Sequence, residues 1–239
     1  MTSQRILILG ASGYIGQHLI PHLTSQGHQV TAAARRIQWL EEQHMPYVQC
    51  QYVDLFKPET IPPALKNIDV VYYLVHSMAE KTHFLDSEKE SAQNLQQALR
   101  HSNVKQVIFL GAIQPKEGGS SQHLLARKIT GEILRTSGIP VTELRAAIII
   151  GPGSAAFEVM RDMVYSLPIL TPPRWVRSKS SPIALENLLI YLSEMLNHPT
   201  EQNRVFDVGG PEYISYQNMF ERFIAITSKK RWIIPIPLP

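Results

Sequence analysis

The chain has 239 residues, enough to bury a sizeable hydrophobic core in one large domain. With 44% hydrophobic and 18% charged residues, its composition is ordinary for a soluble α/β protein. A net charge of +3 argues against a nucleic-acid-binding role, since the basic cluster of Arg174, Arg177 and Lys179 is small. The single cysteine, Cys50, excludes an internal disulfide and a cysteine-based zinc site, and we predict no metal site.

No apolar stretch approaches the ~20 residues that a membrane-spanning helix needs. The apolar run near the N-terminus is required for a strand, so we do not expect a signal peptide. Together with the lone cysteine, these features predict a cytoplasmic protein.

The first element predicted is a buried strand at Arg5–Leu9, followed by a glycine-rich turn and an amphipathic helix at Tyr14–Ser25. Gly10 allows a tight turn, Gly13 lets the backbone approach a pyrophosphate, and Gly16 lets the helix pack on the strand. Free N–H groups and the positive end of the helix dipole then face the anion. The whole predicted phosphate-binding turn reads Gly10-Ala11-Ser12-Gly13-Tyr14-Ile15-Gly16.

The spacing of these glycines resembles that of the short-chain dehydrogenase/reductase superfamily. A lysine followed by serine or threonine is absent after Gly16, so a nucleoside-triphosphate P-loop is not expected. The turn therefore predicts binding of a dinucleotide cofactor.

Apolar runs alternate with helical stretches along the chain, which predicts βαβ units and a Rossmann-type, doubly wound parallel sheet of α/β class. Right-handed crossovers give the first six strands the order 3-2-1-4-5-6. Strands are predicted near Arg5–Leu9, Gln29–Ala34, Tyr47–Gln51, Val70–Leu74, Gln106–Leu110, Val141–Ala146 and Arg204–Val208. Helices are predicted near Tyr14–Ser25, Glu59–Leu65, Lys81–His101, Ser121–Ser137, Ala155–Leu167 and Leu185–Asn197.

The alternation of strands and helices breaks at Gly151-Pro152-Gly153. This break predicts a dinucleotide-binding domain over 1–150 and a lid or substrate region over 151–239. This second region includes the late strand of the same sheet, and the loop Pro168–Pro182 would cover the carboxyl ends of the strands. The chain stops on an apolar, proline-rich run, Ile233–Pro239. We expect this run to pack on the sheet edge, on a partner protein or on a missing C-terminal domain.

The second strand ends at Ala34 and is followed by Arg35 and Arg36, where an NAD-specific site would place an acidic residue. Two guanidinium groups suit a 2′-phosphate, so the sequence favours NADP(H), with NAD(H) possible. The alternative is a solvated basic strand end.

Residues after the later strands are further candidates for cofactor contacts. In the superfamily, the position of Asp54 meets the adenine amino group and that of Leu55 touches the ring; alternatively, Asp54 caps the next helix. Val75 and His76 follow the fourth strand at the switch point, where His76 is a weak acid/base candidate or a ribose contact. Gly111 and Ala112 close the fifth strand.

Reductases of the superfamily use a Tyr-x-x-x-Lys motif and a serine, but the matching positions here are His123 and Arg127, with Gly111 and Ala112 in place of a hydroxyl. Arg127 can contact a ribose but cannot carry a proton. His123 can titrate near neutral pH, or it forms an ordinary surface pair with Arg127. We therefore predict little turnover of simple aldehydes and ketones.

The chain resembles the atypical short-chain dehydrogenases/reductases, specifically NmrA-like and YbjT-like NAD(P)-binding proteins. The resemblance implies that the turn after Ala146 passes the nicotinamide and that Trp175-Val176-Arg177 lines a cleft for an unknown small molecule. The resemblance leaves two functions open, and the loss of the catalytic tyrosine and serine favours a redox-sensing or regulatory protein. The alternative is an NADPH-dependent oxidoreductase or epimerase that acts on an unknown small carbonyl compound at a non-standard site. The residues that carry the resemblance are Gly10–Gly16, Asp54-Leu55, Val141–Ala146, Gly151–Ser154 and Gly209–Glu212.

Overall fold

A computed structural model describes residues 3–76, 84–115, 121–172 and 174–234 of the chain. The chain divides into two compact units, which are described separately. The first comprises Met1–Arg145 and Leu189–Asp207, and the second comprises Ala146–Leu188 and Val208–Pro239. The division of function between 1–150 and 151–239 stays a prediction.

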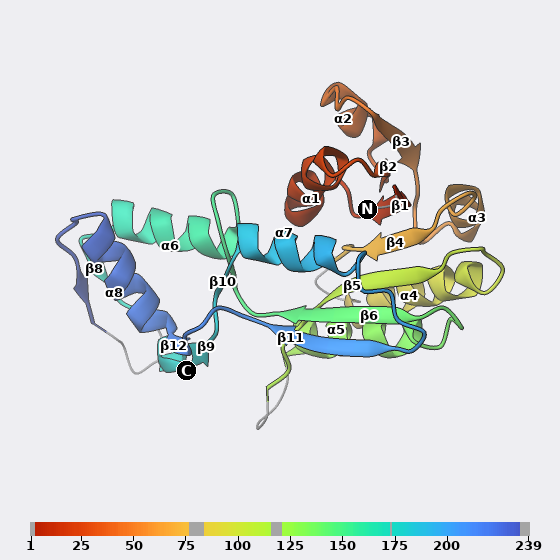
Figure 1. The fold of residues 1–239 in the computed structure, drawn as a ribbon. Coiled ribbons are helices and arrows are strands. Elements are labelled where there is room, and N and C mark those ends of the chain that lie inside the picture. The colour runs from red at the N-terminus through yellow and green to blue at the C-terminus, as the bar shows by residue number, and fades with distance from the viewer. Residues whose placement is uncertain (1–2, 77–83, 116–120, 173, 235–239) are drawn as a thin grey trace. The chain divides into compact units, whose positions relative to one another are not determined.

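A seven-stranded sheet with the strand order β11-β6-β5-β4-β1-β2-β3 organises the first unit (Figure 1). The pairings from β3 through β2, β1 and β4 to β5 are parallel, as expected when helical connections alternate with strands. The predicted order 3-2-1-4-5-6 and the doubly wound fold are confirmed. The strands are β1 (Arg5–Leu9), β2 (Gln29–Ala34), β3 (Val48–Tyr52), β4 (Val70–Tyr73), β5 (Gln106–Ala112), β6 (Val141–Ala146) and β11 (Arg204–Val208).

Helices join these strands, and α4 and α5 pack against each other beside β5 (Figure 1). The region predicted as one helix at Glu59–Leu65 is a 3₁₀ turn, Pro58–Thr60, followed by α3. The sequence did not predict α2, which is short and buries only Leu40. The helices are α1 (Tyr14–Ser25), α2 (Ile37–Glu42), α3 (Ile61–Ala64), α4 (Phe84–Leu99), α5 (Gln122–Leu134) and α7 (Leu185–Glu194).

Both faces of the sheet are covered, because successive side chains of a strand point to opposite sides. In β1, Leu7 and Leu9 belong to a core cluster that also holds Leu95 of α4 and Leu134 of α5. Ile6 and Ile8, which alternate with these leucines along β1, are also fully buried. The opposite face of the sheet is therefore covered as well.

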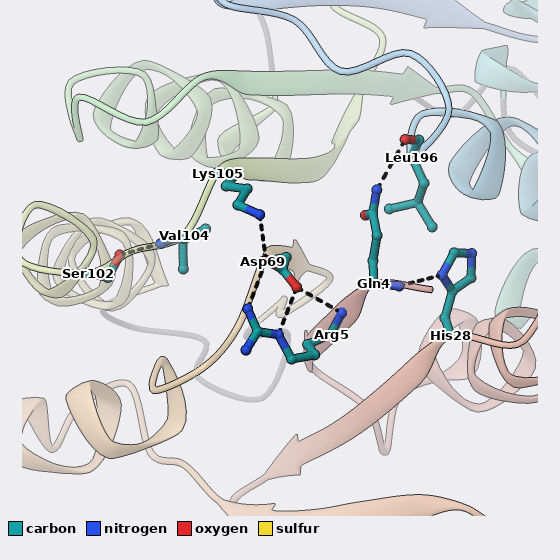
Figure 2. A network of polar contacts seen from close by, with 8 residues as sticks. All are labelled: Gln4, Arg5, His28, Asp69, Ser102, Val104, Lys105 and Leu196. Atoms are coloured by element: carbon teal, nitrogen blue, oxygen red, sulfur yellow. Dashed lines mark hydrogen bonds and ion pairs between the residues drawn. The ribbon is translucent and has the colours of Figure 1, made fainter. Parts of the chain in front are cut away.

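Charged side chains join the amino-terminal ends of three neighbouring strands (Figure 2). Arg5, at the start of β1, donates from Nε and Nη2 to Asp69 at 2.8 and 3.0 Å. Lys105, just before β5, places its Nζ 2.9 Å from the same carboxylate. The hydrogen bond from Arg5, supported by Lys105, holds the pKa of Asp69 well below its ordinary value.

The variant Asp69→Asn should lower the stability of the fold at neutral pH and have less effect in acid. A carboxyl whose folded pKa is depressed stabilises the fold above its unfolded pKa and loses that contribution as the pH falls. Urea unfolding at about pH 7 and about pH 3 measures the difference, with the exposed Glu90→Gln as the control. An equal loss at both pH values would contradict the assignment.

The second unit has its own apolar cluster, formed by α6 (Ala155–Ser166), α8 (Tyr216–Ile226) and the segments around them. Trp232–Ile233, strand β13, pairs in parallel with β8 (Ile169–Leu170), and Ile233 packs against this cluster. Residues 235–239 of the predicted apolar end lie outside the described residues. The remaining short elements are β7 (Ile149–Ile150), the 3₁₀ helix Arg174–Arg177, β9 (Lys179–Ser180), β10 (Ile183–Ala184) and β12 (Ile214–Ser215).

Candidate functional site

The glycine-rich turn lies between β1 and α1, as predicted, and the surroundings of its three glycines differ. Gly10 has a φ of +88°, and a Cβ there would lie 2.9 Å from the carbonyl carbon of Leu74, after β4. A Cβ on Gly16 would come within 2.5 Å of the carbonyl oxygen of Gly10. A side chain at Gly10 or Gly16 would clash with the main chain, so glycine at both positions lets the turn pack closely against its surroundings.

Gly13 differs, because the nearest atom to a Cβ there would be the carbonyl oxygen of Gly10 at 3.2 Å. Gly13 is exposed and is the N-cap of α1, and it provides no side-chain hydrogen bond to the first turn. The half-buried Ser12 and Tyr14 flank it, and Ile15 follows. An uncapped helix start beside an open glycine suits a pyrophosphate, which binds to N–H groups and to the positive dipole end.

The two arginines after β2 are both exposed, and Arg36 is the N-cap of α2. After β3, Asp54 accepts a hydrogen bond from the N–H of Phe56 at 3.1 Å, and Leu55 packs in the core at 6% exposure. The carboxylate of Asp54 thus shapes its own loop. The contacts of Arg35, Arg36, Asp54 and Leu55 with a cofactor stay predictions.

The ends of β5 and β6 are tightly packed. A Cβ on Gly111 would lie 2.7 Å from Oε1 of Glu143, so the side chain of Glu143 would have to shift to admit it. Ala112 is half-buried, and Ala146 is buried as the last residue of β6. A serine at position 111 would therefore require Glu143 to move.

Arg127 is buried at 6% exposure and joins the ends of two strands. Its guanidinium donates to the carbonyl oxygen of Val75 at 2.7 Å and to that of Leu110, and its carbon lies 4.6 Å from the centre of the Phe109 ring. Nη1 is 3.7 Å from Oε2 of Glu88, on α4. The alternative in which Arg127 forms an exposed surface pair with His123 is therefore wrong, since the helix turns Arg127 toward the sheet.

The exposed His123 instead contacts His76. Nδ1 of His123 and Nε2 of His76 are 2.8 Å apart, and Nδ1 of His76 lies 3.4 Å from Oε1 of Glu88. The ring of Phe84 meets His76 edge-on at a centroid distance of 5.5 Å. Thus β4, α4 and α5 together bring an arginine, a glutamate and two histidines to the carboxyl end of the sheet.

The pKa of His123 is lowered chiefly by partial desolvation of its ring, and the nearby His76 and Arg127 act in the same direction. Glu88 opposes this shift. Burial also lowers the pKa of the Arg127 guanidinium, against the opposing effect of Glu88. Shifted titratable groups at the switch point of a doubly wound sheet mark a candidate functional site.

Glu88 is the residue of this site that the sequence interpretation missed. It is 1% exposed and falls on the same face of α4 as Ala92, Leu95 and Leu99. A helical projection of α4 would have placed this acidic residue on the apolar stripe, where a charge needs a partner.

A seven-stranded doubly wound sheet with a glycine-rich first turn defines a dinucleotide-binding protein. A family described as NAD(P)H-binding matches residues 10–162, and the chain belongs to it. This agrees with the predicted membership of the atypical short-chain dehydrogenases/reductases. Among the residues that the structure describes, no helix combines the length and apolarity needed to cross a membrane.

Comparisons with individual proteins support the same class. The chain is 22% identical to a UDP-glucose 4-epimerase of Vibrio cholerae, over 98% of this chain and 79% of that protein. It is 26% identical to the photosystem II assembly factor Ycf39 of Synechocystis, over 77% of this chain, and spans only 54% of Ycf39. The structure of Bordetella bronchiseptica WbmG in complex with NAD has the same fold, with a TM-score of 0.83, 15% identity, and 100% and 86% coverage of the two chains.

The structure leaves part of the predicted cleft undescribed. Ser77 and Met78, which follow His76, lie outside the described residues, as does Ser120 before α5. The side chains of Arg174 and Trp175 are likewise not described, whereas Val176 is buried and Arg177 is exposed.

Proposed function

We propose that this chain binds NADP(H) in preference to NAD(H) at the carboxyl end of the first unit's sheet. The observation that carries the preference is the pair of exposed cations, Arg35 and Arg36, directly after β2, with no acidic residue from Gln29 through Arg36. Guanidinium groups bind a phosphate through charge-assisted hydrogen bonds, whereas a carboxylate at this place would repel it. Phosphate groups of either cofactor would lie at the uncapped start of α1.

Changing Arg35 and Arg36 together to Ala should weaken NADPH binding at least tenfold, or about 1.4 kcal/mol, and leave NADH binding nearly unchanged. The reason is that only NADPH carries the 2′-phosphate. Fluorescence titration of both cofactors measures the effect, and replacing the exposed Arg100 by Ala provides a control for the loss of a positive charge. Equal losses for both cofactors would contradict the assignment.

For the use of the cofactor, we infer an oxidoreductase or epimerase with a non-standard site. The hydrogen-bonded histidines next to Glu88 favour this role, because a titratable group oriented by a second group is the usual arrangement for proton transfer. The similarity to a UDP-glucose 4-epimerase adds support. The substrate is a small hydroxyl or carbonyl compound.

A redox-sensing or regulatory role is the second candidate. The observation that supports this role concerns Arg127, which takes the place of the catalytic lysine. Its guanidinium is already hydrogen-bonded to two main-chain carbonyls. A side chain held in this way is not free for the lysine's part in catalysis. Similarity to an assembly factor is in keeping with a role that needs no turnover.

Cofactor consumption distinguishes the two roles. With a panel of alcohols and nucleotide sugars, we expect turnover that falls about a hundredfold in His123→Ala, or about 2.7 kcal/mol of barrier. His101→Ala, which removes an exposed histidine after α4, should match the wild type. Cofactor binding without turnover on the whole panel would favour the sensor role.

A further inference from the structure

The histidine pair, His76 and His123, has a geometry that restricts where its protons lie. The only ring atoms in hydrogen-bond contact are Nε2 of His76 and Nδ1 of His123, at 2.8 Å. One of these nitrogens must donate and the other accept, because two N–H groups or two lone pairs facing each other repel. Two arrangements of a neutral pair are therefore possible.

Glu88 selects between them. Its carboxylate oxygen lies 3.4 Å from Nδ1 of His76, and its side chain is 2% exposed. A buried negative charge favours a proton on the nitrogen that faces it. With its proton on Nδ1, neutral His76 accepts at Nε2, so His123 donates from Nδ1. Nε2 of His123 then holds a lone pair.

Arg127 places a positive charge beside Glu88. Nη1 of Arg127 lies 3.7 Å from the other carboxylate oxygen, Oε2, and the hydroxyl of Thr130 donates to this oxygen at 3.5 Å. The guanidinium and the carboxylate attract each other, which holds the carboxylate in place beside His76. A chain of successive contacts thus leads from a buried cation to an exposed imidazole ring, through Arg127, Glu88, His76 and His123.

We propose that His123 is the general base of this site, and that Glu88 and His76 are positioning residues that present its Nε2 lone pair to an alcohol substrate. The O–H bond of the alcohol breaks as an N–H bond forms at Nε2, and the carbonyl forms as the hydride of the same carbon passes to the oxidised cofactor. The imidazolium that results donates from Nδ1 to His76, whose own Nδ1–H faces the carboxylate. The same group returns the proton in the reverse direction.

This inference rests on the proposed oxidoreductase function and replaces the tyrosine of the superfamily with a base that is neutral before reaction. The lowered pKa of His123 agrees with it, because the site then holds the base form near neutral pH. Gly10, in the predicted phosphate-binding turn, packs against Leu74 and the main-chain nitrogen of Val75, which is next to His76, so the histidine pair follows the strand that borders this turn.

Long-range proton–nitrogen correlation spectra of the isotope-labelled protein, without cofactor, test the proton positions directly. Both histidines of the pair should carry the proton on Nδ1, whereas free histidine favours Nε2. The exposed His101 should show the ordinary Nε2–H form and serves as the internal control. Finding His123 with its proton on Nε2 in the wild type would overturn the proposal, whatever the variants do.

Two variants then test the positioning role. In His76→Leu and in Glu88→Gln, His123 should shift toward the Nε2–H form, and alcohol oxidation should fall at least tenfold, because leucine cannot accept a hydrogen bond from Nδ1 of His123. The first variant leaves the buried ion pair with Arg127 intact, so it remains informative if Glu88→Gln fails to fold. An unchanged His123 tautomer in a folded His76→Leu variant would refute the relay.

The spectra also separate this inference from the function on which it depends. Absence of turnover with the Nδ1–H forms present would refute the oxidoreductase function, and with it the base role, while leaving the tautomer assignment standing. Turnover with His123 in the Nε2–H form would support the function and refute the inference.

Discussion

Gly13→Val is expected to abolish the binding of both NADPH and NADH while the chain stays folded. A branched side chain on Gly13 would occupy the space that a pyrophosphate needs at the uncapped start of α1. We expect affinity for either cofactor to fall at least a hundredfold, or about 2.7 kcal/mol. Isothermal titration of the two cofactors, with circular dichroism as the check on folding, measures the effect.

Gly16→Ala provides the contrast, since its added carbon would lie within 2.5 Å of the carbonyl oxygen of Gly10. That variant should lose stability, whereas Gly13→Val should lose binding. A folded Gly13→Val protein with unchanged affinity would mean that the phosphates bind elsewhere.

Arg127→Met should destabilise the fold by about 3–5 kcal/mol, because it removes the buried guanidinium that faces the carboxylate of Glu88. The carbonyl oxygens of Val75 and Leu110 would lose a donor at the same time. Urea unfolding followed by circular dichroism measures the change. Lys128→Met, at the exposed neighbouring position on α5, should change stability little.

The double variant Arg127→Met with Glu88→Gln is the second part of this experiment. Removing both charges should recover part of the stability lost in Arg127→Met, since no uncompensated charge remains. A loss below about 1 kcal/mol in Arg127→Met alone would show that the buried guanidinium does not hold the ends of β4 and β5 together.

Local patterns made most of the fold predictable. The strands β1, β2 and β6 have the predicted bounds, because each is a short and mostly buried run. The bounds of β4 and β5 shift by one or two residues at their ends, where the chain leaves the sheet to form the candidate site. Helix α8 was missed because the interpretation of this region relied on breaks in the pattern and not on its apolar face.

Residues 5–16 show what the sequence determined by itself: a strand, a glycine-rich turn and a helix start follow one another within twelve consecutive residues, so this local pattern alone predicts a dinucleotide site. Tertiary structure decided the rest of the candidate site. His76 and His123 are 47 residues apart and meet only because β4 and β5 are neighbours in the sheet. The helical spacing of α4 could have indicated that Glu88 is buried, but not that it faces Arg127 and His76, because those contacts depend on how α4, α5 and the sheet pack together.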